Sequence, residues 1–383
     1  MTYRVPLASP LLKARFIRRP NRFLVVCDLD GKSVEAYLPN PGRLWELLLP
    51  GRILYLVKNP PDPSRSTVFT ALAVEHGGSP ILLHTHLTND VVAHLLAAKK
   101  LPGFEEASVI RREVRAGASR YDFLLEKDGR ELFLEVKSCT LFGEHIAMFP
   151  DAVTERGRKH LEHLARQARQ GIPGGVVFLV HSPRIDRFMP DYHTDYAFAR
   201  TLLEVKDELL VKAVAVDWQG DLSLGPRVRD VEIPWDLIAR EAQDRGSYLL
   251  VLEVARSFSL DVGGLGRLTF PKGCYVYTGS ARANLTKRVE RHLRRRKQFH
   301  WHIDYLRDRA DSCKALPVRA SEDLEHDMAS ALEKMADWSI PRFGSSDCRC
   351  PTHLFGFKEN PVRMPGFIGL LLKFRIDRLE TML

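Results

Sequence analysis

The residues best placed to do chemistry lie at the two ends of one predicted β-hairpin. Asp122 begins the first arm, and Glu135 and Lys137 end the second, around the turn signal Lys-Asp-Gly-Arg at 127–130. Because side chains alternate along a strand, Glu135 and Lys137 point to the same face, and the hairpin can place Asp122 beside them. Two carboxylates about 4 Å apart repel each other by about 4 kcal/mol at an effective dielectric near 20. A divalent cation would relieve that repulsion, so the pattern indicates a metal-binding acid pair.

Metal-assisted hydrolysis is the chemistry that such a pair supports. Oxygen ligands with water in the remaining positions suit Mg²⁺, with Mn²⁺ as a second choice. The ion would polarise a phosphate and acidify a bound water, while Lys137 positions that water or stabilises developing charge. Glu113, nine residues before Asp122, is a candidate third ligand. The alternative is a solvated strand face, but Glu135 lies within the apolar run LFLEV, which argues against simple exposure.

The elements that would position these residues follow a β-then-α/β order. Residues 1–85 contain five short strand-like runs separated by Gly, Pro and Asp clusters, which suits a small barrel or sandwich. A helix is predicted over 88–100 and strands over 108–137. A helix over 154–170 with Gly171 as C-cap residue, a buried strand GVVFLVH, a helix near 195–206 and a strand LVKAVAV complete an α/β pattern.

A domain boundary is expected in the region 221–245. This stretch combines Gly, Pro and mixed charge with a short helical segment, WDLIAREAQ, and a new strand, SYLLVLEV, starts near Ser247. We therefore predict domains at 1–85, 86–235 and 236–383.

The first 235 residues resemble a known family. The segments SRYDFLL, LEVKSCTL and FPDAVTERGRKHL, and the opening stretch RFLVVCDLDGKSVEAYLPNPGRLWELLLPG, are similar to the sugar fermentation stimulation protein A (SfsA) family. The resemblance implies an N-terminal OB-fold barrel, a central α/β domain similar to PD-(D/E)xK nucleases, and DNA binding. On the nuclease pattern, the matching positions are the motif aspartate Asp122, the second acid Glu135, the lysine Lys137 and the upstream acid Glu113.

Three residues of the following helix could face this site. Thr154, Arg156 and His160 lie on the segment 154–170, where they either approach the acid pair or serve as a helix cap and surface charge.

The net charge of +9 and the pI near 9.3 favour a polyanionic partner. Residues 1–240 hold 33 basic and 30 acidic side chains, whereas residues 241–383 hold 24 and 18, so the C-terminal part is more basic per residue. We expect DNA as the partner, with RNA as the alternative.

An N-terminal strand is one candidate for nucleic-acid contact. In ARFIRRPNRF at 14–23, arginines interleave with Phe16 and Phe23, so guanidinium groups could bind phosphate while aromatic faces stack on bases. Alternatively the phenylalanines belong to the barrel core, an interpretation favoured more for Phe23, which sits in the run FLVV, than for Phe16. The arginines concerned are Arg15, Arg18, Arg19 and Arg22.

A second basic segment follows a Tyr-Thr-Gly turn at 277–279. Residues 281–297 carry eight basic side chains and one glutamate, and in one long helix Arg288, Arg291 and Arg295 would share a face. Such a density of charge favours a nearby polyanion over the alternative of a solvated basic face.

This C-terminal region resembles another family. GSY at 246–248, YVYTGSA at 275–281, RVERH at 288–292, HWHIDYL at 300–306 and FGSSDCRCPTHLF at 343–355 are similar to an uncharacterised bacterial and archaeal domain family related to GIY-YIG nucleases. The resemblance implies a GIY-YIG-like α+β domain and phosphodiester hydrolysis. The positions that match its catalytic pattern are Tyr248, Tyr277, Arg288 and Glu325.

Several departures from that pattern bear on catalysis more than on fold. The first motif reads GSY and the second YTG, and the two tyrosines are 29 positions apart, which is wider than usual. Glu322 competes with Glu325 for the role of metal-binding glutamate.

Two further groups could bind metal. His300, His302 and Asp304 form a compact HWHID segment that either ligates a metal, relays a proton or is a structural cluster. Cys348, Cys350 and His353, with Cys313, suggest zinc, but structural zinc sites favour a C-x₂₋₄-C spacing. The tighter C-x-C favours buried thiols over zinc.

The remaining features narrow the class of protein. The composition excludes a disordered chain, and six cysteines are too few for a disulfide framework. No apolar run approaches the roughly 20 residues that span a bilayer, and the N-terminus lacks a signal-peptide core. We expect a cytoplasmic DNA-binding protein with metal-dependent nuclease activity. The alternative is a non-catalytic DNA-binding regulator, as in control of sugar metabolism, whose nuclease-like domains are degenerate.

Overall fold

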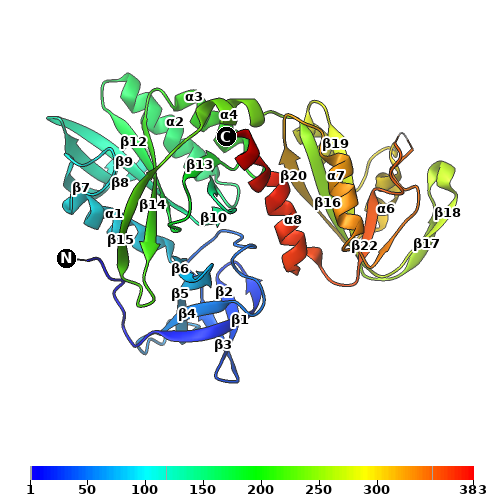
Figure 1. The fold of residues 1–383 in the computed structure, drawn as a ribbon, viewed down its shortest axis with the longest axis horizontal. Helices are drawn as coiled ribbons and strands as arrows, with labels where there is room; N and C mark the ends of the chain where they lie inside the picture. The colour runs from blue at the N-terminus through cyan, green and yellow to red at the C-terminus, as the bar shows by residue number, and fades with distance from the viewer. Residues whose placement is uncertain (1, 118, 347) are drawn as a thin grey trace. The chain divides into compact units, whose positions relative to one another are not determined.

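The computed structural model of the chain describes residues 2–117, 119–346 and 348–383. They form two compact units, and the boundary between the units lies between Trp235 and Asp236 (Figure 1). None of the described helices is long and apolar enough to cross a membrane.

The first unit begins with an OB-like barrel. Its strands run in the order β3-β2-β1-β4-β5-β6, and β3 also pairs with β5, which closes five of them into a barrel. Alternate side chains of each strand fill the interior, so the predicted small barrel is confirmed. The strands are β1 (Leu12–Asn21), β2 (Leu24–Leu29), β3 (Lys32–Tyr37), β4 (Ile53–Lys58), β5 (Phe69–His76) and β6 (Ser79–Leu82).

A mixed α/β layer structure makes up the rest of this unit. A six-stranded sheet has the order β15-β14-β12-β9-β8-β7, in which β12 is parallel to β9 and β14. Apolar residues of α1 pack on one face of the sheet, and those of α2 and α3 pack on the other. The elements are η1 (Thr85–Leu87), α1 (Thr88–Ala97), β7 (Ser108–Ala116), β8 (Ser119–Lys127), β9 (Arg130–Cys139), α2 (Glu155–Arg169), β12 (Gly174–Val180), α3 (Tyr196–Val205), β14 (Leu210–Trp218) and β15 (Leu224–Val231).

A small second sheet, β10-β11-β13, joins the same unit through β10 (Leu141–Phe142), β11 (Ile146–Phe149) and β13 (Arg187–Pro190). The predicted linker region 221–245 is partly wrong, because β15 lies within it and pairs antiparallel with β14. The Gly, Pro and charge signals that suggested a linker are also those of an edge strand.

The second unit is built on an antiparallel sheet of order β20-β16-β19-β22-β21, with a separate hairpin β17-β18 (Figure 1). Its elements are α4 (Trp235–Glu241), which begins at the unit boundary, β16 (Gly246–Val254), β17 (Phe258–Asp261), η2 (Gly263–Leu265), β18 (Arg267–Phe270), β19 (Gly273–Ala281), α5 (Leu285–Leu293), α6 (His302–Arg309), β20 (Ser312–Arg319), α7 (Glu325–Glu333), β21 (Trp338–Ser339), β22 (Leu354–Phe357), η3 (Pro361–Arg363), α8 (Pro365–Arg375) and η4 (Asp377–Met382).

The basic helix of this unit is shorter than the sequence suggested. It ends at Leu293 because Arg294 is extended, so Arg295 lies beyond it and the predicted shared face with Arg288 and Arg291 does not form. The end is fixed from outside the helix, since Arg307 donates to the carbonyl of Leu293.

Candidate functional site

The acid pair lies where the strands of the β8–β9 hairpin separate. The paired residues of this ladder end at Phe123 and Leu134, and Asp122 and Glu135 are the next residues on each strand. Beyond that point a side chain takes the place of a backbone partner. Asp122 Oδ2 accepts a hydrogen bond from the backbone N–H of Val136 on β9 at 2.7 Å. The opening therefore presents both carboxylates where the pairing of the two strands ends.

Glu135 is almost fully buried, with 4% of its surface exposed. Its Oε1 accepts from Lys137 Nζ at 2.5 Å and from His160 Nδ1 at 2.7 Å. Its Oε2 is buried and has no hydrogen-bond partner among the described residues. A buried carboxylate oxygen without a partner carries a large desolvation cost, which a ligand would remove.

The two carboxyl groups differ in their proton affinity. Burial, followed by the charge of Glu135, raises the pKa of Asp122 to about 6, although hydrogen bonds from Val136 and Asn89 oppose this. Burial also acts to raise the pKa of Glu135, but Lys137 and His160 outweigh it and the pKa is lowered. Asp122 therefore carries the excess negative charge of the pair, and a cation between the two acids would relieve it.

The third predicted ligand is not brought into this pair. Glu113 lies on β7 opposite this part of β8, but its backbone has a φ of +57° and its carboxylate forms an ion pair with Arg120. In the described part of the chain, Asp122, Glu135 and Glu113 do not form a group of three metal ligands.

Helix α2 supplies one residue of the site. Thr154 caps the helix by accepting from the N–H of Gly157 at 3.1 Å, as its alternative interpretation proposed. His160, six residues further on, faces Glu135, and Arg156 Nε lies 3.4 Å from His160 Nε2. The apolar face of the helix packs on the sheet, which holds His160 over Glu135 in the middle of β9.

A cavity of about 590 Å³ opens beside His160, and its lining is strongly basic. The sequence had offered Arg156 and His160 as side chains that could face the acid pair, whereas the other cations of the lining were not predicted because they lack a regular spacing. Strand pairing places Arg115 opposite Arg120, and α2 adds its own cations. The basic residues that line the cavity are Arg115, Arg120, Arg156, Lys159, His160 and His163. Asn89, whose amide donates to Asp122 Oδ1 at 2.7 Å, was also not predicted.

On the barrel, the structure reverses the expectation for the two phenylalanines. Phe16 is buried in the core, whereas Phe23 is 45% exposed and stacks on Tyr37 with ring centroids 6.5 Å apart. The reason is that Phe23 lies in the turn between β1 and β2, outside the alternating pattern of either strand.

The four arginines of that segment differ in their exposure and bonding. Arg15, Arg18 and Arg22 are exposed, whereas Arg19 donates to four backbone carbonyls and is part of the fold.

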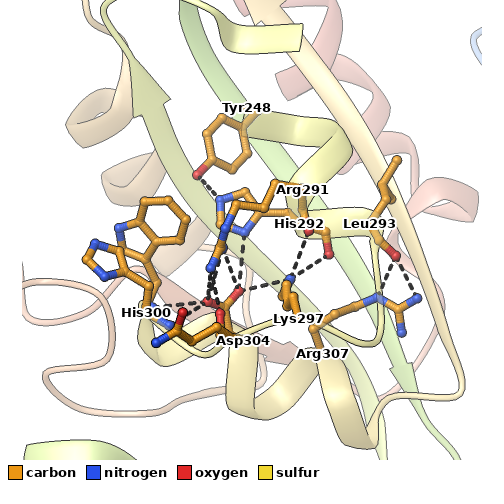
Figure 2. Close-up of polar contacts among 10 residues, drawn as sticks. Tyr248, Arg291, His292, Leu293, Lys297, His300, Asp304 and Arg307 are labelled. Carbon is orange, nitrogen blue, oxygen red and sulfur yellow. Dashed lines mark hydrogen bonds and ion pairs between the residues drawn. The ribbon is translucent and has the colours of Figure 1, made fainter. Parts of the chain in front are cut away.

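In the second unit, Tyr248 and Tyr277 lie on the neighbouring strands β16 and β19, and both side chains are buried. The hydroxyl of Tyr248 is hydrogen-bonded to His292 Nε2 at 2.9 Å (Figure 2). Burial raises the pKa of Tyr248, so the hydroxyl stays neutral.

The buried side chain of Asp304 forms ion pairs with two cations of the basic segment, Arg291 and Lys297. Asp304 accepts from Arg291 Nη1 at 3.1 Å, and Lys297 Nζ lies 2.9 Å from its other oxygen (Figure 2). The backbone N–H groups of His300 and Trp301 donate to the same carboxylate, which caps α6. The HWHID segment thus has a structural arrangement, and no metal-ligand group forms there among the described residues.

The remaining motif residues meet at Ser280. Arg288 Nη1 donates to the carbonyl of Ser280 at 3.0 Å, and the Ser280 hydroxyl donates to Glu325 Oε2 at 2.5 Å. The rival Glu322 pairs instead with Arg378. Arg295 Nε donates to the carbonyl of Asp308.

Comparison with known protein families matches three regions of the chain. They are the SfsA N-terminal OB domain at 17–83, the sugar fermentation stimulation protein RE domain at 86–221, and a domain of unknown function, DUF123, at 247–367.

Individual relatives agree with the first two matches. The sugar fermentation stimulation protein homolog of Chloroflexus aurantiacus is 41% identical over 230 residues, which cover 59% of this chain and 88% of the relative. That of Methanothermobacter thermautotrophicus is 34% identical over 229 residues, which cover 55% and 95%.

Among solved structures, that of Pyrococcus furiosus SfsA in complex with Ca²⁺ aligns with a TM-score of 0.54 at 29% identity. The alignment covers 60% of this chain and 99% of that one. With its OB-like barrel, its α/β layer and relatives matched over most of their length, this chain belongs to the sugar fermentation stimulation protein family.

Proposed function

We propose that the first unit is a metal-dependent nuclease that binds DNA and hydrolyses phosphodiester bonds at Asp122, Glu135 and Lys137. One observation carries the proposal. The buried Glu135 Oε2 has no partner among the described residues, beside an aspartate whose pKa is raised to about 6. A structural ion pair would satisfy this oxygen, whereas a metal-binding acid pair leaves it for the ion.

The donor set fits a hard divalent ion such as Mg²⁺ or Mn²⁺, held by Asp122 and Glu135. Such an ion supplies a Lewis acid for the phosphate and a more acidic water. The crystallised P. furiosus relative is described as a Ca²⁺ complex, which supports divalent-ion binding in the family.

The protein groups around the acid pair have distinct roles in this proposal. Lys137 and His160 keep Glu135 ionised, and the Lys137 ammonium stabilises negative charge that develops on the phosphate. At neutral pH Asp122 is ionised, since its pKa is about 6. We assign residues 86–235 to a PD-(D/E)xK nuclease-like domain on this basis.

The basic cavity and the barrel would hold the nucleic acid. The cations beside His160 suit a phosphate backbone close to the acid pair. On residues 1–85, the stacked rings of Phe23 and Tyr37 with exposed Arg15, Arg18 and Arg22 suit an unpaired base and its phosphates.

The alternative function is a non-catalytic DNA-binding regulator, and it applies best to residues 236–383. We assign this region to a GIY-YIG-like domain without nuclease activity. Tyr248 is buried against His292, and Arg291 and Arg295 bind the protein itself. The Tyr248 hydroxyl is therefore buried away from a substrate, although Arg295 is exposed.

Cleavage assays with the full chain test the proposal. The substrates are single-stranded, duplex and branched DNA and RNA, each with Mg²⁺, Mn²⁺ or Ca²⁺. We expect cleavage with Mg²⁺ or Mn²⁺ that Asp122→Ala abolishes while DNA affinity changes less than about threefold. If the wild type cleaves none of these substrates, the nuclease proposal fails and the regulator remains. Cleavage that survives in Asp122→Ala would place the catalytic site elsewhere.

A further inference from the structure

Four metal-binding side chains meet at one point of the second unit, far from the acid pair in sequence. His326 comes from the first turn of α7, and Cys348, Cys350 and His353 come from the segment between β21 and β22. One nitrogen or sulfur atom of each residue lies within 4.8 Å of the corresponding atoms of the other three. The sequence contains the C-x-C-x-x-H part of this group, but His326 is 22 positions before Cys348.

The distances fit a tetrahedral metal site. With Zn–S near 2.3 Å and Zn–N near 2.1 Å, the edges of a tetrahedron measure roughly 3.4 to 3.8 Å. In the structure His326 Nδ1 lies 3.1 Å from Cys350 Sγ, and His353 Nε2 lies 3.4 Å from Cys348 Sγ. Small side-chain rotations would bring the widest separations to tetrahedral values.

A carboxylate lies beside the other ring nitrogen of the fourth ligand, His353. His353 is buried, and its Nδ1 lies 2.7 Å from Glu325 Oε1 while its Nε2 faces Cys348. A carboxylate behind the distal nitrogen fixes the tautomer and orientation of a metal-binding histidine. The His353 backbone is also fixed, because its carbonyl accepts from the N–H of Thr278 on β19.

The surroundings suit a structural ion. Between Ile340 and Thr352 the chain has no helix or strand in its described part, and a metal would tie this long loop to α7. A cavity of about 460 Å³ beside the cluster is lined partly by the apolar residues Ala329, Pro351 and Phe355. Two thiolates would balance the charge of one divalent ion.

We propose that His326, Cys348, Cys350 and His353 bind one structural Zn²⁺. Two sulfur and two nitrogen donors in this arrangement favour zinc over the oxygen-preferring Mg²⁺ and Ca²⁺. The short C-x-C spacing argued against zinc in the sequence. The structure offsets that objection because His326 and His353 complete a four-ligand set.

The zinc site gives Glu325 a role different from the one implied by its resemblance to GIY-YIG nucleases. Its two carboxylate oxygens contact His353 and Ser280, so Glu325 is a positioning residue for a zinc ligand. In this unit the glutamate that matches the catalytic pattern would support the loop.

Metal analysis of the untagged full chain, purified without added zinc, tests the proposal. We expect about one zinc per chain in the wild type and in Cys313→Ser, a matched control whose thiol lies outside the cluster. The double variant Cys348→Ser with Cys350→Ser should contain less than a tenth of that amount. In Glu325→Gln, we expect zinc affinity measured by chelator competition to fall by about 10- to 100-fold at unchanged stoichiometry.

Cobalt substitution keeps the test informative if the double variant unfolds. Zinc is removed from the wild type with a chelator and Co²⁺ is added, and thiolate-to-cobalt charge-transfer absorption at one equivalent is expected. A wild type with free thiols that holds no zinc and shows no such absorption would overturn the proposal. Zinc content that is unchanged in the double variant, or a Cys348–Cys350 disulfide in freshly reduced protein, would also contradict it.

Discussion

The acid pair of the first unit and the Asp304 cluster of the second are built from the same residue types but are balanced differently. At Asp122 and Glu135, a half-buried and a buried carboxylate share one lysine, the pKa of Asp122 is raised, and one oxygen of Glu135 has no partner among the described residues. At Asp304, a single carboxylate is surrounded by Arg291, Lys297 and two backbone N–H groups.

The difference separates a site with an unpaired buried carboxylate oxygen from a site whose carboxylate oxygens are both bonded by neighbouring groups. Around Asp304 the charge of the carboxylate is compensated by two cations of the protein, and the pKa of Asp304 is held low by its hydrogen bonds despite burial. Around Asp122 the negative charge exceeds the local positive charge, which costs folding free energy unless a cation binds. Two nuclease-like resemblances therefore lead to opposite expectations for activity.

The largest effect is expected from breaking the complete cluster. Asp304→Asn leaves Arg291 and the buried Lys297 without their counter-charge, so the free energy of unfolding should fall by about 3 kcal/mol. Denaturant titration of the variant measures this. Asp308→Asn, on the same helix but partly exposed and paired with Arg309, should change stability by less than about 0.5 kcal/mol. Equal effects of the two variants would mean that the cluster is not the structural centre we describe.

A catalytic loss of comparable size is expected at the incomplete site. Lys137→Ala removes the ammonium beside Glu135, and cleavage should fall by about 10²- to 10³-fold, the effect of removing one charge-stabilising donor. Turnover rates under saturating DNA measure it. The control Lys127→Ala lies on the same hairpin and pairs with Asp128 in the turn, so its rate should match the wild type. A small rate loss in Lys137→Ala with a large loss of DNA affinity would assign the lysine to binding alone.

Removing the excess charge should stabilise the protein. The pKa of Asp122 is raised from its ordinary value of 3.8 to about 6, so the folded state binds more protons than the unfolded state between these pH values. The stabilisation by the protonated carboxyl is fully present below pH 3.8 and is lost as the pH rises through about 6. Above that pH, in metal-free buffer, Asp122→Asn should therefore raise the free energy of unfolding by about 1 to 2 kcal/mol.

The matched control for this variant is Asp128→Asn at the exposed hairpin turn, where the positive φ tolerates asparagine and stability should not change. The gain of Asp122→Asn should also disappear below pH 4, where the wild-type carboxyl is protonated. Destabilisation by Asp122→Asn at pH 8 would contradict the view that the acid pair is under-compensated.

Much of the acid pair could be predicted from the sequence because local signals fix it. The Asp-Gly turn sets the hairpin register, alternation places Glu135 with Lys137, and the Thr154 cap starts the helix that carries His160. What the sequence missed depends on distant pairing. His326 meets Cys348 only through the packing of α7 on the sheet.

Two errors came from local irregularities that composition does not record. Phe23 lies in a turn rather than in a strand, and the chain leaves the helical conformation at Arg294, which removes the expected face of cations. Both errors concerned where a regular element ends, and a residue beyond the end does not follow the pattern of that element.

The smallest effect is expected in the salt dependence of DNA binding, which tests whether the exposed cations of the first unit contact phosphate. Arg115 and Arg156 are exposed and line the cavity beside His160, whereas Arg291 is committed to Asp304. Each phosphate contact contributes about 0.9 to the slope of log affinity against log salt concentration. Arg115→Ala with Arg156→Ala should therefore reduce the slope for duplex DNA by about 2, measured by fluorescence anisotropy over a salt series. The control Arg200→Ala removes an equally exposed arginine on α3, paired with Glu204, and should leave the slope unchanged. If the cavity variant keeps the full slope, the cavity does not hold the backbone, and the exposed arginines of the barrel become the expected site of contact.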